Sequence, residues 1–327
     1  MWLAEFLEME NDVGDILEPL IERRADPHIY RHTDGYYYFT ATVPQYDRIE
    51  LRRAKTIEGL ASAQTRSVWR KAAGGPCAEL IRAPEIHFHD GAWYVYFAAA
   101  PSRDMRNKQS DHRLYAIRNT HPNPLAGEWE FMGQVDTGLD TPCGDATTFT
   151  HNGRLYYLWA QKHAAIEGGA SLYIAPMATP WQLAGAPVML GKPELDWECR
   201  GAPASGGPAV LKKHGRVFVS YSVGATDRDC ALGLLWADEN ANLLDPAAWT
   251  KSPAPVLESC HVHKVHGPGH NSFTVAEDGS TVLLVYHART YTEIEGDPSW
   301  NPDRHIFVKP LRWRDDGMPD FGRASLR

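Results

Sequence analysis

The hydrophobic and polar positions of the chain follow one local pattern: a short apolar run, a turn, and an alternating run rich in aromatic residues. The turn contains Asp-Gly, Asn-Gly or His-Gly, so each unit has the sequence form of a β-hairpin. Five copies occur: ADPHIYRHTDGYYYFTAT from Ala25, RAPEIHFHDGAWYVYFAA from Arg82, GDATTFTHNGRLYYLWAQ from Gly144, GGPAVLKKHGRVFVSYS from Gly206 and GHNSFTVAEDGSTVLLVYHA from Gly269.

The copies recur at intervals of roughly sixty residues, and helical periodicity is almost absent outside the acidic first twenty residues. Many short strands with a long repeat favour four-stranded blades arranged around an axis. We therefore predict an all-β fold, a five-bladed β-propeller, as a single domain over 1–327 with a short N-terminal extension at 1–20. A solenoid is the competing architecture, but its repeats are usually shorter and lack this aromatic hairpin.

Composition and charge exclude some classes of binding partner and predict a cellular compartment. The 327 residues are 43% hydrophobic and carry a formal charge of −8, which argues against a nucleic-acid-binding surface. No apolar stretch approaches the ~18 residues that a membrane span needs, and the N-terminus does not have the form of a signal peptide. The five cysteines are scattered, without CxxC spacing, which fits reduced thiols. We expect a cytoplasmic protein without nucleic-acid or membrane partners; the oligomeric state stays open.

The starts of the five units should meet near one axis, because the first strand of each propeller blade lines the central channel. These starts hold Asp26, Ala83-Pro84-Glu85, Asp145, Gly206-Gly207 and His270-Asn271. Asp26 and Asp145 occupy equivalent places in two units. A lone Asp beside Pro or Gly usually caps a turn, but two equivalent carboxylates facing an axis are what glycoside hydrolysis requires.

Other residues are weaker candidates. The stretch HVHKVHGPGHNSF could offer His261, His263, His266 and His270 to a metal, but no nearby carboxylate or cysteine completes a zinc set. We expect His270 to face the channel as a metal ligand, a water holder or a sugar contact. Arg289 would stabilise an ionised Asp, unless it is a surface charge. Trp159 and Gln161 would either contact a sugar or belong to the core.

The chain resembles glycoside hydrolase family 43, and within it the exo-acting α-L-arabinofuranosidase group. The resemblance extends from about residue 20 to residue 322 and is most specific in the first and fifth units. The matching segments are ADPHIYRHTDGYYYFTATVPQYDRIELRRAKTIEGL, APEIHF, DATTF, GPGHNSFTVAEDG, VYHAR and MPDFG.

The resemblance implies a five-bladed propeller and an inverting, single-displacement mechanism on an oligosaccharide or glycoside substrate. It implies that Asp26 is the general base, that Asp145 tunes and orients the acid, and that Arg289 supports the base and the sugar. It places His270 near the channel centre, where many members hold calcium. Glu85 and Arg82, at the start of the second unit, join Trp159 and Gln161 as candidates for substrate binding.

One segment departs from the family pattern. The family usually has Val-Asn-Glu-Gly-Pro, whose Glu is the general acid, whereas this chain has ASGGP and places Gly206 at that position. Arg82 also precedes APE where related sequences tend to carry Trp, and the TDRDC segment at 226–230 replaces a stretch that commonly includes His. The scaffold matches while positions that face the pocket differ, which indicates altered function or a deliberately modified protein.

A positioned general acid contributes about 10²–10⁴-fold to the rate, so three hypotheses follow. Another residue donates the proton, such as Glu198, Asp229 or a histidine of HVHKVH. Alternatively, the chain is a carbohydrate-binding propeller without full activity. In the third, the pocket is reshaped for a different glycoside, with Arg82 recognising an anionic group. We expect a glycosidase acting on short α-L-arabinofuranosides with reduced or altered activity, and the carbohydrate-binding propeller is the alternative.

Overall fold

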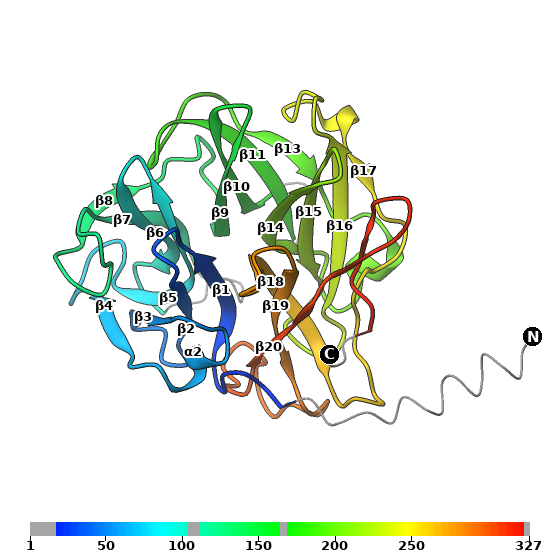
Figure 1. The fold of residues 1–327 in the computed structure, drawn as a ribbon, viewed down its shortest axis with the longest axis horizontal. Helices are drawn as coiled ribbons and strands as arrows, with labels where there is room; N and C mark the ends of the chain where they lie inside the picture. Colours follow the sequence, from blue (N-terminus) through cyan, green and yellow to red (C-terminus); the bar gives the residue numbers. More distant parts are fainter. Residues whose placement is uncertain (1–17, 104–110, 164–168, 324–327) are drawn as a thin grey trace, which may run out of the picture.

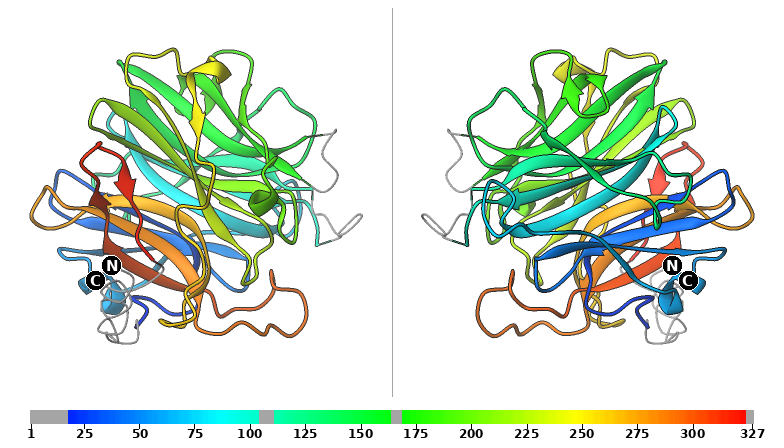
Figure 2. Two further views of the ribbon diagram at one scale, coloured as in Figure 1. Left: turned by 90° about the vertical axis from the view of Figure 1, so that its right-hand side faces the viewer. Right: turned by 90° about the vertical axis from the view of Figure 1, so that its left-hand side faces the viewer.

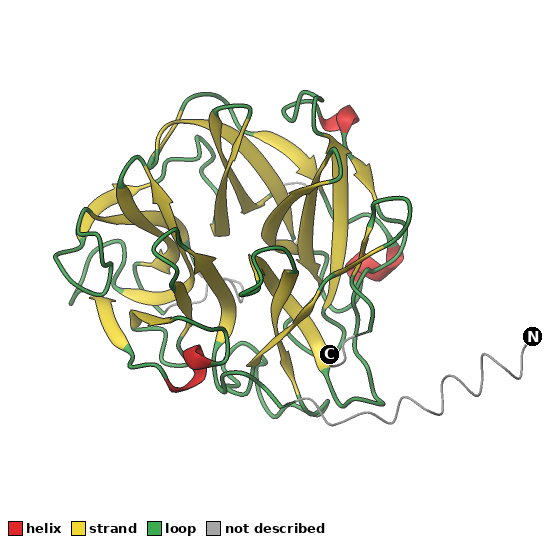
Figure 3. Cartoon of the chain, in the orientation of Figure 1, coloured by secondary structure: helices red, strands yellow, loops and turns green. Residues whose placement is uncertain are grey.

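Five antiparallel sheets surround a central axis in the computed structural model, which describes residues 18–103, 111–163 and 169–323 (Figure 1). Strands dominate, with only short helical segments between them (Figure 3). The prediction of an all-β, five-bladed propeller is confirmed. The prediction of a single domain over 1–327 stays a prediction, and most of the expected extension at 1–20 lies outside the described residues.

The first two blades contain four strands each, ordered from the axis outward as they follow in the chain. The first blade comprises β1 (Ala25–Arg31), β2 (Tyr37–Thr42), β3 (Arg48–Ala54) and β4 (Arg66–Arg70). The second comprises β5 (Glu79–His89), β6 (Ala92–Ala100), β7 (Arg113–Asn119) and β8 (Glu130–Gln134). A short helix, α2 (Gly59–Ser62), lies between β3 and β4.

The third and fourth blades follow the same order. The third comprises β9 (Cys143–His151), β10 (Arg154–Lys162), β11 (Ala170–Thr179), β12 (Gln182–Leu183) and β13 (Val188–Gly191), the last two both pairing with β11. The fourth comprises β14 (Ser205–Lys213), β15 (Arg216–Val223), β16 (Ala231–Asp238) and β17 (Thr250–Lys251). Two 3₁₀ helices, η1 (Asp196–Cys199) and η2 (Pro246–Ala248), lie in the connections.

The fifth blade closes the ring. It comprises β18 (His266–Val275), β19 (Val282–Arg289) and β20 (His305–Pro310), and a separate ribbon of β21 (Arg312–Trp313) and β22 (Pro319–Asp320) follows it. Ile21, near the start of the described chain, forms a β-bridge to Ile306 on the outer edge of β20. Residues from both ends of the chain therefore meet in one blade.

The turn residues explain the innermost hairpins. In Asp90-Gly91, Asn152-Gly153 and His214-Gly215, both residues have positive φ, between 48° and 77°. Two consecutive residues with positive φ form the type I′ turn, whose twist matches that of paired strands. The Asp-Gly, Asn-Gly and His-Gly pairs noted in the sequence therefore fix the register of three blades.

The hydrophobic core lies between the blades. The five large clusters of buried apolar residues each join two neighbouring blades, and one of them joins the first blade to the fifth through Ile29, Leu283, Val285 and Ile306. Figure 2 shows the sheets packed face against face around the ring. Among the described residues, no helix is long and apolar enough to cross a membrane.

Candidate active site

The innermost strand of every blade carries the same irregularity at the start of its unit. Register shifts interrupt β1, β5, β9, β14 and β18 near the axis. One residue there adopts a left-handed backbone: Asp26 (φ 55°), Ala83 (48°), Asp145 (55°), Gly207 (53°) and His270 (41°). A non-glycine residue costs about 1 kcal/mol in this conformation, and such strain clusters at functional sites. The five unit starts are therefore structurally equivalent, as the repeat predicted.

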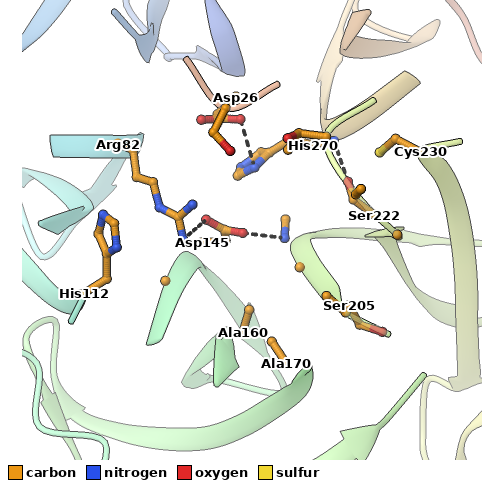
Figure 4. Close-up of a pocket in the computed structure, with 18 of the residues that line it drawn as sticks. Asp26, Arg82, His112, Asp145, Ala160, Ala170, Ser205, Ser222, Cys230 and His270 are labelled. Carbon is orange, nitrogen blue, oxygen red and sulfur yellow. Dashed lines mark hydrogen bonds and ion pairs between the residues drawn. The ribbon is translucent and has the colours of Figure 1, made fainter. Parts of the chain in front are cut away.

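These bulges line a cavity of about 340 Å³ at one end of the channel. Asp26, Arg82, Asp145, Gly206 and His270 all face it, each from a different blade (Figure 4). Residues more than 200 positions apart in sequence therefore share one pocket. The structure brings together the two carboxylates that the sequence analysis selected.

Asp26 is held on several sides. The Thr42 hydroxyl donates to its Oδ2 at 2.6 Å, and its own backbone N–H donates to His287 Nδ1 at 2.9 Å. The Arg304 guanidinium and His270 Nδ1 lie 3.5 Å and 3.4 Å from Oδ1. The carboxylate is almost wholly buried, with the residue 7% exposed, so its orientation is fixed before any ligand arrives.

The charges around Asp26 keep it ionised. Burial alone would raise its pKa, but the nearby charges of His270 and Arg304 outweigh burial and hold the pKa well below the usual range. Burial also lowers the pKa of His287 to about 4, so this imidazole is neutral near pH 7. Asp26 thus has the charge state that a base needs to accept a proton from water.

Asp145 lies across the cavity with two neighbours. Its Oδ2 accepts a hydrogen bond from the Gly207 backbone N–H at 3.2 Å, and Arg82 Nη2 lies 4.0 Å from its Oδ1 (Figure 4). A Cβ at Gly206 would meet Asp145 Oδ2 at 2.8 Å. The carboxylate therefore occupies part of the space that a side chain at position 206 would need.

Gly206 and Gly207 differ in whether the fold leaves room for a side chain. Gly207 has a left-handed backbone, and a Cβ there would lie 2.9–3.1 Å from the ring and backbone of His270. Gly206 has no positive φ, and its nearest obstacle is the movable end of the Asp145 side chain. A side chain is thus excluded at 207 by the fold but allowed at 206 once Asp145 moves.

One side of the cavity is basic. Arg82 and Lys162 both line it, and Arg82 Nε and Lys162 Nζ are buried without a hydrogen-bond partner among the described residues. Burial, with a smaller contribution from the charge of Arg82, lowers the pKa of Lys162. The two cations lie near the bare position at Gly206.

The sequence analysis assigned the arginine beside the base to Arg289, and the structure places Arg304 there instead. Arg289 is buried behind the cavity, where it donates to the carbonyls of Thr226 and Pro298. Arg304 is the first residue before β20 and lies outside the repeated hairpin motif, so no repeat position marked it. Thr42 and His287 were missed for a different reason: both lie within the repeated hairpins, but on the second strands and not at the unit starts.

Glu198 does not lie at the cavity. It is a fully buried residue of η1, where its carboxylate accepts hydrogen bonds from Tyr221 Oη at 2.7 Å and from the N–H groups of Glu194 and Leu195 at 3.0 Å. Lys251 Nζ lies 3.1 Å away. All of its oxygens have partners within this network, so the structure does not support Glu198 as a substitute proton donor.

Three expected sugar contacts also lie elsewhere. Trp159 and Gln161 are fully buried, and Trp159 Nε1 donates to Gln161 Oε1 at 2.8 Å while Gln161 Nε2 donates to Thr141. They belong to the core because β10 is the second strand of its blade, covered by its neighbours. Glu85 points away from this cavity, toward a second one further along the same strands.

His270 faces the cavity, as expected, but its surroundings do not fit a calcium cage built by the protein. Calcium takes six to eight oxygen ligands. The carboxylate nearest to His270 belongs to Asp26, which is already engaged by Thr42 and Arg304. Among the described residues, His270 belongs to no group of three or more possible metal ligands.

Comparisons with known proteins agree with this geometry. The family model for glycosyl hydrolases family 43 matches residues 16–319. An extracellular exo-alpha-(1->5)-L-arabinofuranosidase of Streptomyces chartreusis is 50% identical over 86% of this chain and 84% of its own length. A protein of the same name from Streptomyces avermitilis is 49% identical over 93% of this chain, which spans only 62% of that relative.

Among solved structures, the alpha-L-arabinofuranosidase from Lactobacillus brevis superposes with a TM-score of 0.93 at 52% identity, covering 95% of this chain and 98% of that one. The expectation of a cytoplasmic location is wrong by these comparisons, because the two Streptomyces relatives are named as extracellular proteins. Scattered cysteines without CxxC spacing do not distinguish the compartments, since extracellular proteins also occur without disulfides. The chain belongs to glycosyl hydrolases family 43.

Proposed function

We propose that this chain is an inverting glycosidase acting on short α-L-arabinofuranosides, with Asp26 as the general base and no general acid at position 206. The observation that carries the proposal is the pairing of a buried, ionised Asp26 with a bare Gly206 in one cavity. The names of the relatives support an exo-acting enzyme on α-1,5-linked arabinofuranosides.

The proposed reaction is a single displacement. Asp26 accepts a proton from water, the water oxygen bonds to the anomeric carbon, and the glycosidic bond breaks on the opposite face of the sugar. The departing oxygen keeps the bonding electrons and must take a proton from solvent, because no side chain at 206 supplies one. A phenolate leaves readily without this proton, whereas a sugar alkoxide does not.

Arg82 and Lys162 support a second candidate, a glycosidase whose substrate carries a carboxylate. Both residues line the cavity, and the charge of Arg82 helps to lower the pKa of Lys162, so a bound anion would offset their mutual repulsion. The two candidates share the proposed base and differ in the charge of the substrate. Isothermal titration with glucuronate and with neutral arabinose separates them, because only the second candidate requires tighter binding of the acid, abolished by Arg82→Gln.

The test of the proposed activity compares an aryl α-L-arabinofuranoside with α-1,5-arabinobiose. We expect the aryl substrate to be cleaved with inversion, which NMR of the first-formed anomer detects. We expect the rate of cleavage of the disaccharide to be ~10²-fold lower than that of a family member that has its general acid. Asp26→Asn should remove both activities. If the unaltered chain cleaved both substrates more slowly than that family member by the same factor, the missing-acid proposal would be wrong. Binding of arabinose without any hydrolysis would favour the carbohydrate-binding alternative.

A further inference from the structure

Three side chains form a compact group outside the candidate active site. His28, Glu85 and His87 each offer one ligand atom, and these atoms lie within 4.8 Å of one another. All three residues are buried, at 8%, 4% and 6% exposure. Within the described parts of the chain, this is the one group of three or more His, Cys, Asp or Glu side chains with such spacing.

The propeller geometry explains why they meet. His28 lies two residues beyond the left-handed Asp26 in β1, and Glu85 lies two residues beyond the left-handed Ala83 in β5. They are therefore equivalent positions on the innermost strands of neighbouring blades. His87 lies two residues further along β5, on the same face as Glu85 because side chains alternate in a strand.

The contacts leave the group incomplete. His87 Nε2 lies 2.9 Å from Glu85 Oε2, and His28 Nε2 lies 3.6 Å from the same oxygen. His28 Nδ1 is buried and has no hydrogen-bond partner among the described residues. Tetrahedral zinc with bonds of about 2.0–2.1 Å separates its ligand atoms by roughly 3.3 Å. The two distances to Glu85 Oε2 are near this value, and the three ligand atoms as a set lie within 4.8 Å, so binding requires the side chains to move closer around the ion.

The contacts of the carboxylate favour a cation at this place. Among the described residues, Glu85 forms ion pairs only with the imidazoles of His28 and His87, and not with a lysine or an arginine. A buried carboxylate is costly unless it is paired, and a divalent ion held between its oxygen and the two imidazole nitrogens would pair it.

A second cavity gives access to the group. Its volume is about 270 Å³, and the three ligands line it together with Thr147, Ser272 and Thr274. It follows the same five innermost strands beyond the bulges that form the active-site cavity. The hydroxyls of Ser272 and Thr274 are buried without partners among the described residues, which provides polar sites for water at an open coordination position.

We propose that His28, Glu85 and His87 bind one divalent transition-metal ion of the zinc class, which ties the first blade to the second. Two imidazoles and one carboxylate suit zinc or cobalt, whereas calcium and magnesium prefer sites made only of oxygen. The site is separate from His270 and from the chemistry at Asp26. It stabilises the ring and takes no part in hydrolysis.

The experiment uses the full chain, treated with a chelator and then dialysed, with cobalt(II) and zinc(II) as probes. We expect one zinc per chain by elemental analysis after equilibrium dialysis, visible absorption bands of four- or five-coordinate cobalt, and a higher Tm with zinc. His28→Gln and Glu85→Gln should each weaken binding by at least ~10-fold and abolish the Tm shift. Rates with an aryl arabinofuranoside should be the same with and without zinc.

The control is His261→Gln, in an exposed histidine of the HVHKVH stretch, which should bind zinc like the unaltered chain. Failure of the unaltered chain to bind zinc stoichiometrically would overturn the proposal and leave a hydrogen-bonded group. Binding lost in His261→Gln but kept in both ligand variants would also overturn it, by assigning the metal to the surface. If one ligand variant fails to fold, the cobalt spectrum of the other variant tests the proposal, which requires the visible bands to be lost in that variant.

Discussion

Gly206 is the residue on which the proposed function depends most. Its backbone accepts a side chain, and the obstacle to one is the carboxylate of Asp145, which leans into the space at 2.8 Å from a Cβ position. Asp145 is free to move because the side chain is partly exposed, at 19%, and is held by one backbone N–H and a distant Arg82. A proton donor can therefore be restored by one substitution.

Gly206→Glu should raise kcat/KM for α-1,5-arabinobiose by about 10²-fold and change that for an aryl arabinofuranoside only a few fold, since a phenolate needs no proton. It should also create an alkaline limb in the pH profile, because a general acid stops working as pH rises through its pKa. Gly206→Gln has the same size without the proton. An equal gain from Gln would show that filling the space, and not proton donation, is what matters.

Arg304 contributes to the charge state of Asp26, the proposed general base. Its guanidinium, 3.5 Å from Asp26 Oδ1, helps to hold the pKa of Asp26 below the usual range. Arg304→Gln should raise that pKa, because one of the positive charges that lower it would be removed. Because Asp26 must be ionised to act, the acidic limb of kcat/KM against pH should then move to higher pH.

Arg289→Gln serves as the matched control, since Arg289 is equally buried but binds the carbonyls of Thr226 and Pro298 and not Asp26. It should lower Tm without moving the acidic limb. If both variants moved the limb equally, the assignment of Arg304 to the base would be wrong.

Among the secondary-structure elements, η1 shows how a carboxylate can serve the fold alone. Glu198 has a hydroxyl, two backbone N–H groups and an ammonium as partners, all in the space between η1, β15 and β17. Burial, followed by the charge of Glu198, raises the pKa of Tyr221, so the phenol stays protonated and donates its hydrogen bond.

Glu198→Gln should lower the free energy of unfolding by about 2–4 kcal/mol, because an amide NH₂ would face hydrogen-bond donors and Lys251 would lose one of its two carboxylate partners. The kcat/KM of the folded protein should stay within twofold of the unaltered value. Urea unfolding and hydrolysis of an aryl arabinofuranoside measure the two effects. A tenfold loss of activity at unchanged stability would return Glu198 to the list of proton donors.

For the ring of blades, stability depends on how its two ends are joined. Ile21 pairs with Ile306 across the edge of β20, and its side chain, 5% exposed, packs in the cluster between the first and fifth blades. Backbone hydrogen bonds from Leu20 to Ile306 and from Ile306 to Ile21 reinforce this closure.

Ile21→Ala should therefore lower the free energy of unfolding by about 2–4 kcal/mol, the usual cost of a cavity in a core. Val262→Ala is the comparison, since Val262 is 71% exposed and should change stability little. Chemical denaturation followed by tryptophan fluorescence measures both. Similar effects from the two variants would mean that the junction of the first and fifth blades contributes no special stability.

The repeated hairpin pattern was sufficient to predict the fold, because alternating strands, Asp-Gly or Asn-Gly turns and a period of roughly sixty residues are local properties of the chain. The same repeat predicted that Asp26, Asp145 and His270 share a cavity, since equivalent positions in radial blades meet at the axis. Local sequence also marked Gly206 as unusual, through its resemblance to a family motif.

Contacts between blades could not be predicted in this way. Arg304 and not Arg289 reaches Asp26, Glu198 is enclosed by Tyr221 and Lys251, and His28 meets Glu85 and His87, because side-chain direction and packing between sheets decide these pairs. His28 and Glu85 occupy equivalent positions in neighbouring units, but Arg304 and Glu198 lie outside the repeated hairpins, so the repeat did not mark their contacts. These contacts form between parts of the chain that are distant in sequence, and such packing leaves no local sequence pattern from which it could be predicted.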